Sequence, residues 1–239
     1  MSSGENVKEP SRTEVWKMFD AISPTYDRIN RILSLGMDRS WRSKAAEHLP
    51  TKENLALLDL ATGTADQLIA LFDSKASIKS AIGIDLSSEM LSIGKKKIDQ
   101  KPYKEKVSLQ RGDAEKIPFK DASFHAVSLS FGIRNVIDPL TSMKEIHRVL
   151  KKGGKCLILE FSLPPKPIRP FYLFYLRHIL PYIGALFSKS KNAYRYLNQT
   201  IETFPSGNAF LDLLEKAEFT KKAAYPMAFG AVTLYVAEK

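Results

Sequence analysis

The sequence predicts a doubly wound α/β fold: a seven-stranded sheet with an antiparallel edge hairpin, an N-terminal helical cap and a helical insertion after the fifth strand. Between residues 55 and 161, short apolar runs alternate with amphipathic segments, as in right-handed βαβ units whose parallel sheet is covered on both faces. The last two apolar runs are separated only by Pro226–Gly230, which is too short for a helical crossover and therefore indicates an antiparallel pair. The 239 residues are 44% hydrophobic and 26% charged, which is typical of one globular chain with a main core.

Two helices are predicted in the cap, which comprises residues 1–50. Residues Thr13–Leu33 carry apolar side chains at helical spacing, with Pro24 as an interruption. Asp38 is expected to cap a second helix that runs to His48.

The sheet domain is expected to comprise residues 51–239, with the insertion at about 162–204. Its strands are predicted, in order, at Leu55–Leu60, Lys79–Ile84, Val107–Gln110, Phe124–Phe131, Lys155–Phe161, Thr220–Tyr225 and Ala231–Val236. Its helices are predicted at Asp66–Phe72, Ser87–Asp99 with Ser87 as the cap, Asp138–Leu150 and Ser206–Ala217. The Lys-Lys-Gly-Gly run at Lys151–Gly154 is a stop signal for the third of these helices.

The net charge of +10 predicts an anionic partner: nucleic acid, a phospholipid surface or an acidic metabolite. The single cysteine, Cys156, cannot form an intrachain disulfide, so a reducing compartment is expected. The N-terminus has no apolar core of a secretory signal, and no clean membrane span is present. Together these features predict a cytoplasmic protein.

The insertion has an unusual charge pattern. No acidic residue occurs from Phe161 to Ile201, and six basic residues do: Lys166, Arg169, Arg177, Lys189, Lys191 and Arg195. An aromatic-rich run, Ile168–Phe187, lies among them and is broken by two prolines and two arginines. Basic and large apolar side chains in one segment favour peripheral docking on the anionic inner face of the membrane, or a greasy ligand. A buried helix with a solvated rim explains the pattern about equally well.

The carboxyl ends of the predicted strands carry polar residues where a doubly wound fold binds its ligand. The first strand contains Asp59 and leads into a turn with Gly63 and Thr64. The second strand leads to Asp85, placed to hold a ribose diol, and the third to Asp113-Ala114, placed to meet an adenine edge. The dinucleotide fingerprint GxGxxG is absent, which disfavours a hydride-transfer enzyme. Carboxylates without a glycine-rich phosphate cradle favour a sulfonium cofactor.

Four sequence blocks stand out: YDRINRILSLGMDRSW (26–41), TGTAD (62–66), SFGIRNV (130–136) and RVLKKGGKCLILEFS (148–162), with a weaker YRYL (194–197). In these blocks the chain resembles the ubiquinone/menaquinone-biosynthesis C-methyltransferase family, of the seven-stranded class I methyltransferase fold. Its departures are Ile29, Asp38, Ala65 and Lys152, where the family has methionine, histidine, glycine and proline.

The resemblance implies S-adenosylmethionine-dependent C-methylation of a polyprenylated quinol ring, with demethylmenaquinol as the expected substrate. The alternative within the family is the benzoquinol of the ubiquinone pathway. By the same resemblance, the cofactor contacts are expected to be Thr64, Asp85, Asp113, Ala114 and Ser130.

Methylation of a quinol carbon requires a cation that lowers the pKa of the quinol hydroxyl. Arg134, just beyond the fourth strand, is the candidate, with Asn135 beside it as a hydrogen-bond donor. The competing interpretation of Arg134 is a surface ion pair with Asp138. Tyr194, Arg195 and Tyr196 are expected to close the pocket from the insertion. No metal is expected, because no His or Cys cluster has ligand spacing.

Two alternatives from other classes remain. A nucleic-acid methyltransferase fits the basic charge, but SFGIRN offers neither an aromatic-flanked proline pair to clamp a flipped base nor a cysteine nucleophile, so no nucleic-acid partner is expected. A non-catalytic lipid-binding module is supported only by Ala65 and Asp38. The oligomeric state is left open by the sequence, with a homodimer as one option.

Overall fold

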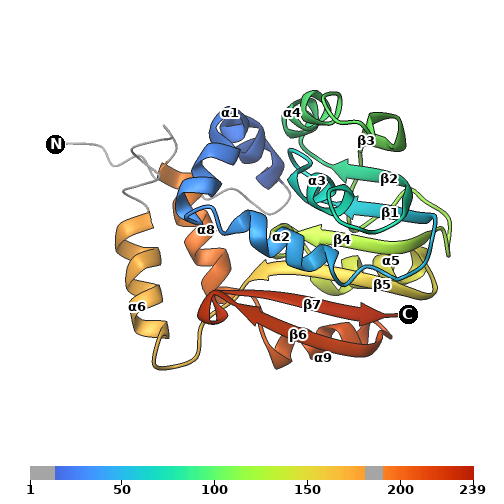
Figure 1. Ribbon diagram of the computed structural model, residues 1–239. Helices are drawn as coiled ribbons and strands as arrows, with labels where there is room; N and C mark the ends of the chain where they lie inside the picture. The colour runs from blue at the N-terminus through green and yellow to red at the C-terminus, as the bar shows by residue number, and fades with distance from the viewer. Residues whose placement is uncertain (1–13, 181–190) are drawn as a thin grey trace.

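The computed structural model describes residues 14–180 and 191–239. Within them lies one seven-stranded sheet in the order β3-β2-β1-β4-β5-β7-β6 (Figure 1). The strands are β1 (Leu55–Leu60), β2 (Ile78–Asp85), β3 (Val107–Arg111), β4 (Phe124–Ser130), β5 (Leu150–Phe161), β6 (Thr220–Met227) and β7 (Val232–Glu238). The first five pair in parallel, and β7 is antiparallel to both β5 and β6. The predicted fold, with its antiparallel edge hairpin, is confirmed.

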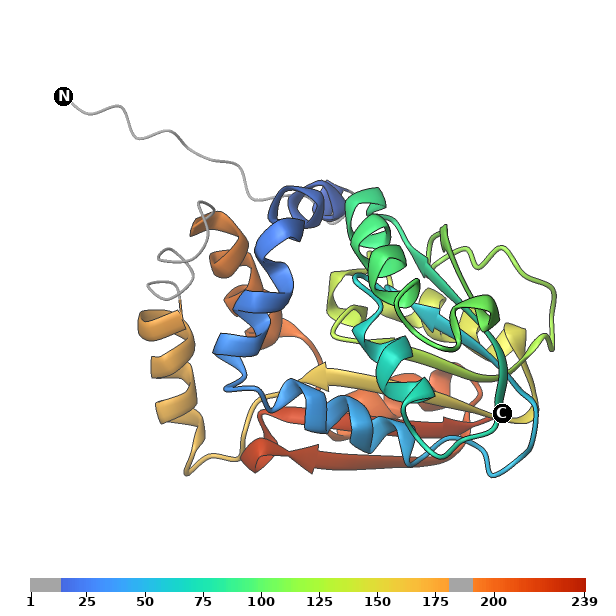
Figure 2. The ribbon, with the colours of Figure 1, turned by 45° about the horizontal axis from the view of Figure 1, so that its top comes forward.

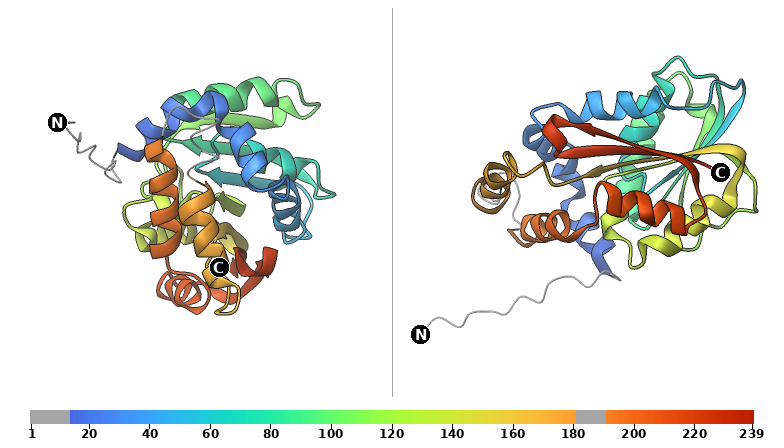
Figure 3. Two further views of the ribbon diagram at one scale, coloured as in Figure 1. Left: turned by 90° about the vertical axis from the view of Figure 1, so that its left-hand side faces the viewer. Right: turned by 90° about the horizontal axis from the view of Figure 1, so that it is seen from below.

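Helices cover both faces of the sheet (Figure 3). They are α1 (Val15–Leu33), α2 (Asp38–Ala46), α3 (Asp66–Phe72), α4 (Ser88–Ile98), α5 (Pro139–Val149), α6 (Arg169–Phe174), the π-helical turn Tyr175–Ile179, α8 (Lys191–Thr203) and α9 (Asn208–Lys216). Helices α5 and α9 bury Met143, Ile146 and Leu214 in one core cluster. Helices α2 and α3 bury Ala45 and Leu68 in the cluster on the other face. The pattern is that of a doubly wound sheet.

Of the two predicted helix caps, Ser87 is confirmed, and Asp138 is a further cap that was not among the predictions. The Ser87 hydroxyl accepts the Met90 N–H (3.1 Å) at the start of α4, and the Asp138 carboxylate accepts the Leu140 N–H (2.9 Å) at the start of α5. The predicted Asp38 cap was wrong, because Met37 is the residue before α2 and Asp38 makes no capping bond. Its buried carboxylate instead accepts hydrogen bonds from Arg31 at 2.6 Å and from the Ser34 hydroxyl at 2.8 Å.

Helix α1 runs continuously through Pro24. A proline inside a helix leaves the carbonyl four residues earlier without its N–H donor, which here is the carbonyl of Asp20. The Ser23 hydroxyl donates to that carbonyl at 2.9 Å and replaces the missing bond. Pro24 therefore does not end the helix, and α1 runs as one long helix past the carboxyl ends of the parallel strands.

The insertion packs against α1 at the carboxyl ends of the parallel strands (Figure 2). Ile29 of α1, Leu176 and Leu180 near the π-helical turn, and Ile201 of α8 form a third buried cluster. None of the helices in the described ranges is both long and apolar enough to cross a membrane. The N-terminal helices and the insertion together roof the edge of the sheet where the predicted ligand-binding residues lie.

Candidate functional site

Two adjoining pockets open under this roof. The strand-end pocket, about 360 Å³, is lined by the strand-end loops after β1, β2, β3 and β4 and by the first turns of α1. The apolar pocket, about 450 Å³, is lined by α1, α2, the π-helical turn, α8 and the tip of the β6–β7 hairpin. Four residues line both pockets: Phe19, Tyr26, Phe131 and Asn135. A ligand in one pocket can therefore touch a ligand in the other.

The strand-end pocket is acidic. Asp85, Asp113 and Glu115 line it, and the described lining includes no lysine or arginine. The Asp85 carboxylate accepts the Gly63 N–H and the Ser87 N–H, each at 2.8 Å, and burial raises its pKa. Each carboxylate oxygen keeps a second lone pair that can accept a further bond. The pocket thus presents acceptors and negative charge, which suits a cation with a diol and does not suit a phosphate.

Close backbone approach shapes this pocket. A Cβ on Gly132 would lie 2.5 Å from the Cβ of Ala61, so this turn requires glycine, whereas Gly63 has open space around it and is favoured by its φ of +53°. Ala65 adopts φ +66° at the start of α3 and is fully buried. The left-handed conformation costs an alanine about 1 kcal/mol, which the burial of its methyl group offsets by about 0.8 kcal/mol. The alanine therefore keeps the turn that a glycine would make.

Asp59 lies behind the pocket wall and not on it. Its carboxylate, 1% exposed, accepts the hydroxyls of Thr62 at 2.6 Å and Ser128 at 2.5 Å, so it ties the end of β1 to β4. Burial raises the pKa of Asp59 to about 6. Asp59 therefore positions the loop after β1, and it is not among the described residues that line the strand-end pocket.

The raised pKa of Asp59 predicts a pH-dependent stability difference. The folded protein holds this proton more tightly than the unfolded chain, so the stabilisation is full below the unfolded pKa of about 3.9. It is lost as the pH rises through about 6. Relative to the parent, Asp59→Asn should therefore gain up to about 3 kcal/mol in free energy of unfolding between about pH 4 and pH 7. Urea unfolding at both pH values measures the difference, and a constant difference would contradict the assignment.

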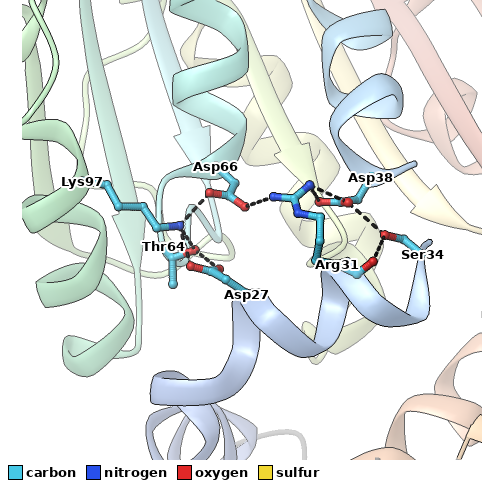
Figure 4. A network of polar contacts seen from close by, with 7 residues as sticks. All are labelled: Asp27, Arg31, Ser34, Asp38, Thr64, Asp66 and Lys97. Carbon is cyan, nitrogen blue, oxygen red and sulfur yellow. Dashed lines mark hydrogen bonds and ion pairs between the residues drawn. The ribbon is translucent and has the colours of Figure 1, made fainter. Parts of the chain in front are cut away.

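Thr64 also faces away from the strand-end pocket, into a polar network that joins α1 to the loop after β1 (Figure 4). Its hydroxyl donates to Asp27 at 2.6 Å, and Lys97 of α4 reaches both of these residues and Asp66. Arg31 continues the network from Asp66 (3.6 Å) to Asp38 (2.6 Å). These half-buried ion pairs fix the cap over the turn and thereby position Gly63 and Ala65.

Arg134 projects into the apolar pocket from the turn after β4 and is 5% exposed. Its Nη1 lies 2.6 Å from a carboxylate oxygen of Glu160, which is 0% exposed, and donates to the Phe131 carbonyl at 2.7 Å. The competing interpretation of Arg134, a surface ion pair with Asp138, is wrong, because its ion-pair partner is the buried Glu160. Burial raises the pKa of Glu160, against the opposing effect of Arg134. The Nε of Arg134 is buried and has no hydrogen-bond partner among the described residues.

Asn135 lies at the junction of the two pockets. Its side-chain Oδ1 is buried and, within the described residues, accepts no hydrogen bond. Sequence reasoning expected this side chain to donate, whereas the placement of its atoms leaves an acceptor open. Arg134 and Asn135, neighbours in the lining of the apolar pocket, therefore carry a buried donor and a buried acceptor that lack partners among the described residues.

The other predicted site residues divide between the two pockets. Gly63, Asp85, Asp113, Ala114 and Ser130 line the strand-end pocket. Ser130 also donates its hydroxyl to the Gln67 side chain at 2.9 Å. Tyr196 lines the apolar pocket, as expected for a residue of the insertion. The side chains of Tyr194 and Arg195 lie outside the described residues.

Sequence reasoning did not single out several residues of the site. Trp16 and Phe19 of α1 cover the strand-end pocket, and Tyr26 separates the two pockets. Burial raises the pKa of Tyr26, so its hydroxyl is protonated at neutral pH. Arg42 of α2 lies 5.2 Å from the Phe131 ring and adds a second cation to the apolar pocket. The one sequence signal for these residues was the position of Tyr26 at the start of the block YDRINRILSLGMDRSW (26–41). The helical spacing of apolar residues predicts which side chains are buried, but it does not predict which of them contact a ligand.

Comparison with known proteins gives matches over nearly the whole chain. The model of the ubiE/COQ5 methyltransferase family matches residues 5–239. The demethylmenaquinone methyltransferase of Chlorobaculum parvum is 43% identical, covering 98% of this chain and 95% of that protein. The ubiquinone/menaquinone biosynthesis C-methyltransferase UbiE of Geotalea uraniireducens is 40% identical, covering 95% of this chain and 96% of that protein. A solved SAM-dependent methyltransferase of Thermotoga maritima has a TM-score of 0.67 at 22% identity, covers 94% of this chain and 99% of that one, and supports the fold.

Proposed function

Because the chain belongs to the ubiE/COQ5 methyltransferase family and is thus a SAM-dependent methyltransferase, we propose that it methylates a ring carbon of demethylmenaquinol. One observation carries the proposal: an acidic pocket and an apolar pocket share a wall, and the apolar one holds an unpartnered buried arginine N–H. The acidic pocket matches a cationic methyl donor, and the apolar pocket matches a hydrophobic methyl acceptor that has an ionisable oxygen.

The strand-end pocket suits S-adenosylmethionine. When bound, this cofactor supplies a methyl group on a positively charged sulfur. Asp85 would hold the ribose hydroxyls, and the loop at Asp113 and Ala114 would meet the adenine. Ser130 and Gly63 would complete the wall. The absence of lysine and arginine from the described lining supports a cationic ligand at this position.

The apolar pocket suits the quinol and the start of its prenyl tail. The Arg134 guanidinium, in the pocket lining, would favour the anion of a quinol oxygen and so direct electron density onto the ring carbon. The Asn135 Oδ1 would accept a hydrogen bond from a quinol hydroxyl and orient the ring. The aromatic rings of Trp41, Phe131 and Phe161 would exclude water from the space around the quinol ring. Tyr196 would close this pocket from α8.

The activity is tested with purified protein, S-adenosylmethionine and short-chain acceptors. We expect methylated product by mass spectrometry from a demethylnaphthoquinol, less from a 2-methoxybenzoquinol and none from RNA. A preference for the benzoquinol would move the substrate to the ubiquinone pathway. Methylation of RNA alone would overturn the proposal.

Peripheral attachment to an anionic membrane is part of the proposal, since a polyprenyl substrate must enter from lipid. At the mouth of the apolar pocket, Leu35 and Phe229 are each 84% exposed, with φ +51° and +56°. Large apolar residues rarely adopt this left-handed backbone conformation, and residues that do so are often found at functional sites. Phe171 and Phe174 of α6 are exposed as well. Of the basic residues in the insertion, Arg177 is already paired with Glu202, which lowers its expected contribution.

The variant Leu35→Asn/Phe229→Asn should bind acidic vesicles at least about tenfold more weakly, because two apolar side chains no longer enter the lipid. Asparagine tolerates the left-handed conformation, so the fold should not lose stability. Sedimentation with phosphatidylglycerol vesicles measures the binding, which should also weaken with salt. The matched control is Tyr225→Asn, at an exposed aromatic residue on β6. Equal binding of the double variant and the control would contradict docking through the pocket mouth.

A further inference from the structure

A third cavity lies at the opposite edge of the sheet, where the parallel strands begin. It has a volume of about 370 Å³ and lies between the segment before β1, the start of β4 and the turn within β5. Four lysines and a histidine line it: Lys52, Lys151, Lys152, Lys155 and His125. We call it the basic cavity. Neither pocket of the proposed methyltransferase site shares a residue with it.

Within the described residues, no acidic side chain pairs with the lysines of the basic cavity. No aspartate or glutamate is among its lining residues. In the described parts of the chain, no carboxylate lies within ion-pair distance of these four lysines. The Lys155 ammonium group donates one hydrogen bond to the His48 carbonyl at 3.2 Å, but a carbonyl oxygen does not neutralise its positive charge. Ammonium groups of four lysines around one cavity repel one another unless an anion joins them.

Hydrogen bonding at His125 indicates where such an anion would sit. The backbone N–H of Ala56 donates to the His125 Nδ1 at 3.0 Å, so this nitrogen carries a lone pair. The proton of the neutral ring is then on Nε2. Nε2 lies 3.2 Å from the Nζ of Lys151, so two N–H donors face each other without an acceptor. One oxygen of an oxyanion, placed to the side of the pair and within hydrogen-bond distance of both nitrogens, would satisfy both.

The turn that presents the lysines is held in place by the end of the chain. Gly153 has φ +73°, and its N–H donates to the Lys239 carbonyl at 2.9 Å. The Lys239 N–H donates to the Gly154 carbonyl at 3.0 Å. Lys151 and Lys152 therefore project from a backbone that is already fixed, which reduces the entropy lost on binding.

We propose that the basic cavity is a binding site for a small phosphate-bearing anion, separate from the methyltransferase site. Lysine ammonium groups bind phosphate as point charges, and the His125 Nε2–H adds one directed hydrogen bond. No large apolar side chain lines the cavity, which favours a water-soluble phosphate compound over the headgroup and chains of a lipid. Its volume exceeds the needs of a single phosphate ion, so pyrophosphate is the first probe.

Titration calorimetry of the full chain with pyrophosphate should show one saturable site. Lys52→Gln/Lys151→Gln should weaken it by roughly tenfold or more, because each lysine contributes a charged contact. Lys96→Gln, at an exposed lysine of α4 away from the cavity, should leave the affinity within about twofold. The fold check is the methyltransferase activity and the melting temperature of both variants, which should match those of the parent.

The ring signals of His125 provide a second readout by NMR. Burial and the nearby ammonium groups of Lys151 and Lys52 lower the pKa of His125. Pyrophosphate in the cavity should raise this pKa, whereas potassium chloride at equal ionic strength should not. Absence of a saturable site, equal loss in the Lys96 control, or a chloride effect equal to that of pyrophosphate would overturn the proposal. Loss of binding to phosphatidylglycerol vesicles in the double variant, without pyrophosphate binding, would assign the cavity to a lipid headgroup and also overturn it.

Discussion

Replacing Arg134 by glutamine should lower turnover with a short-chain quinol by about 10²–10³, the usual effect of removing one preorganised stabiliser of developing negative charge. Cofactor affinity should change little, because Arg134 lines the apolar pocket and not the strand-end pocket. The loss should shrink as the pH rises, since hydroxide then ionises the quinol without help. Arg134→Lys should recover part of the rate, because the ammonium keeps the charge but not the planar fork.

The buried ion pair complicates this experiment. Arg134→Gln also leaves Glu160 buried without its partner, which costs about 3–5 kcal/mol in stability when a buried pair is broken. The matched variant is Arg134→Gln/Glu160→Gln, in which neither charge remains. It should recover most of the stability, measured by urea unfolding, but not the turnover. Recovery of turnover to within about threefold of the parent would show that the arginine only balances Glu160, and the quinol oxygen would then be held by Arg42 or by α8.

The elements of the sheet could be predicted from the sequence because each strand is short, apolar and bounded by a turn or a helix. Ser87 was recognisable as a cap, since capping is a local interaction of a side chain with the next turn. Asp38 was not, because its role depends on Arg31, seven residues away on another helix. Local chemistry is visible in a sequence, and a tertiary partner generally is not.

The same distinction explains what the sequence showed of the site. Asp85 and Asp113 were found because the carboxyl ends of neighbouring parallel strands meet at one edge. Asp59, inside the end of β1, and Thr64, in the loop after it, were expected at the same edge, yet their side chains turn to Thr62, Ser128 and Asp27. Strand-end position gives the neighbourhood of a side chain but not its rotamer.

The partner of Arg134 could not be predicted for a different reason. Glu160 lies in the apolar run of β5, 26 residues from Arg134. A carboxylate at 0% exposure in a strand interior is rare unless a cation reaches it. Glu160 within that apolar run was therefore a signal of a buried ion pair, but only the sheet order places β4 beside β5.

Removing the Asp85 carboxylate should have the largest effect on cofactor binding. A bidentate carboxylate on a ribose diol contributes about 2–3 kcal/mol, so Asp85→Ala should weaken S-adenosylmethionine binding about 30- to 150-fold in titration calorimetry. The structure adds a second source of loss, because Asp85 also holds the Gly63 and Ser87 N–H groups. An affinity loss alone would not separate the direct contact from the loop.

A cofactor analogue that lacks one ribose hydroxyl separates them. In the parent, the deoxy analogue should bind more weakly because one hydrogen bond to Asp85 is missing, whereas Asp85→Ala should bind both ligands equally. Equal discrimination in both proteins would place the diol elsewhere and leave Asp85 as a loop anchor. The affinity of the parent should also fall with acid at a higher pH than for an exposed aspartate, since burial raises the pKa of Asp85 and only its ionised form accepts two hydroxyls. Asp85→Ala has no carboxylate to protonate, so this acid limb should be absent from its binding profile.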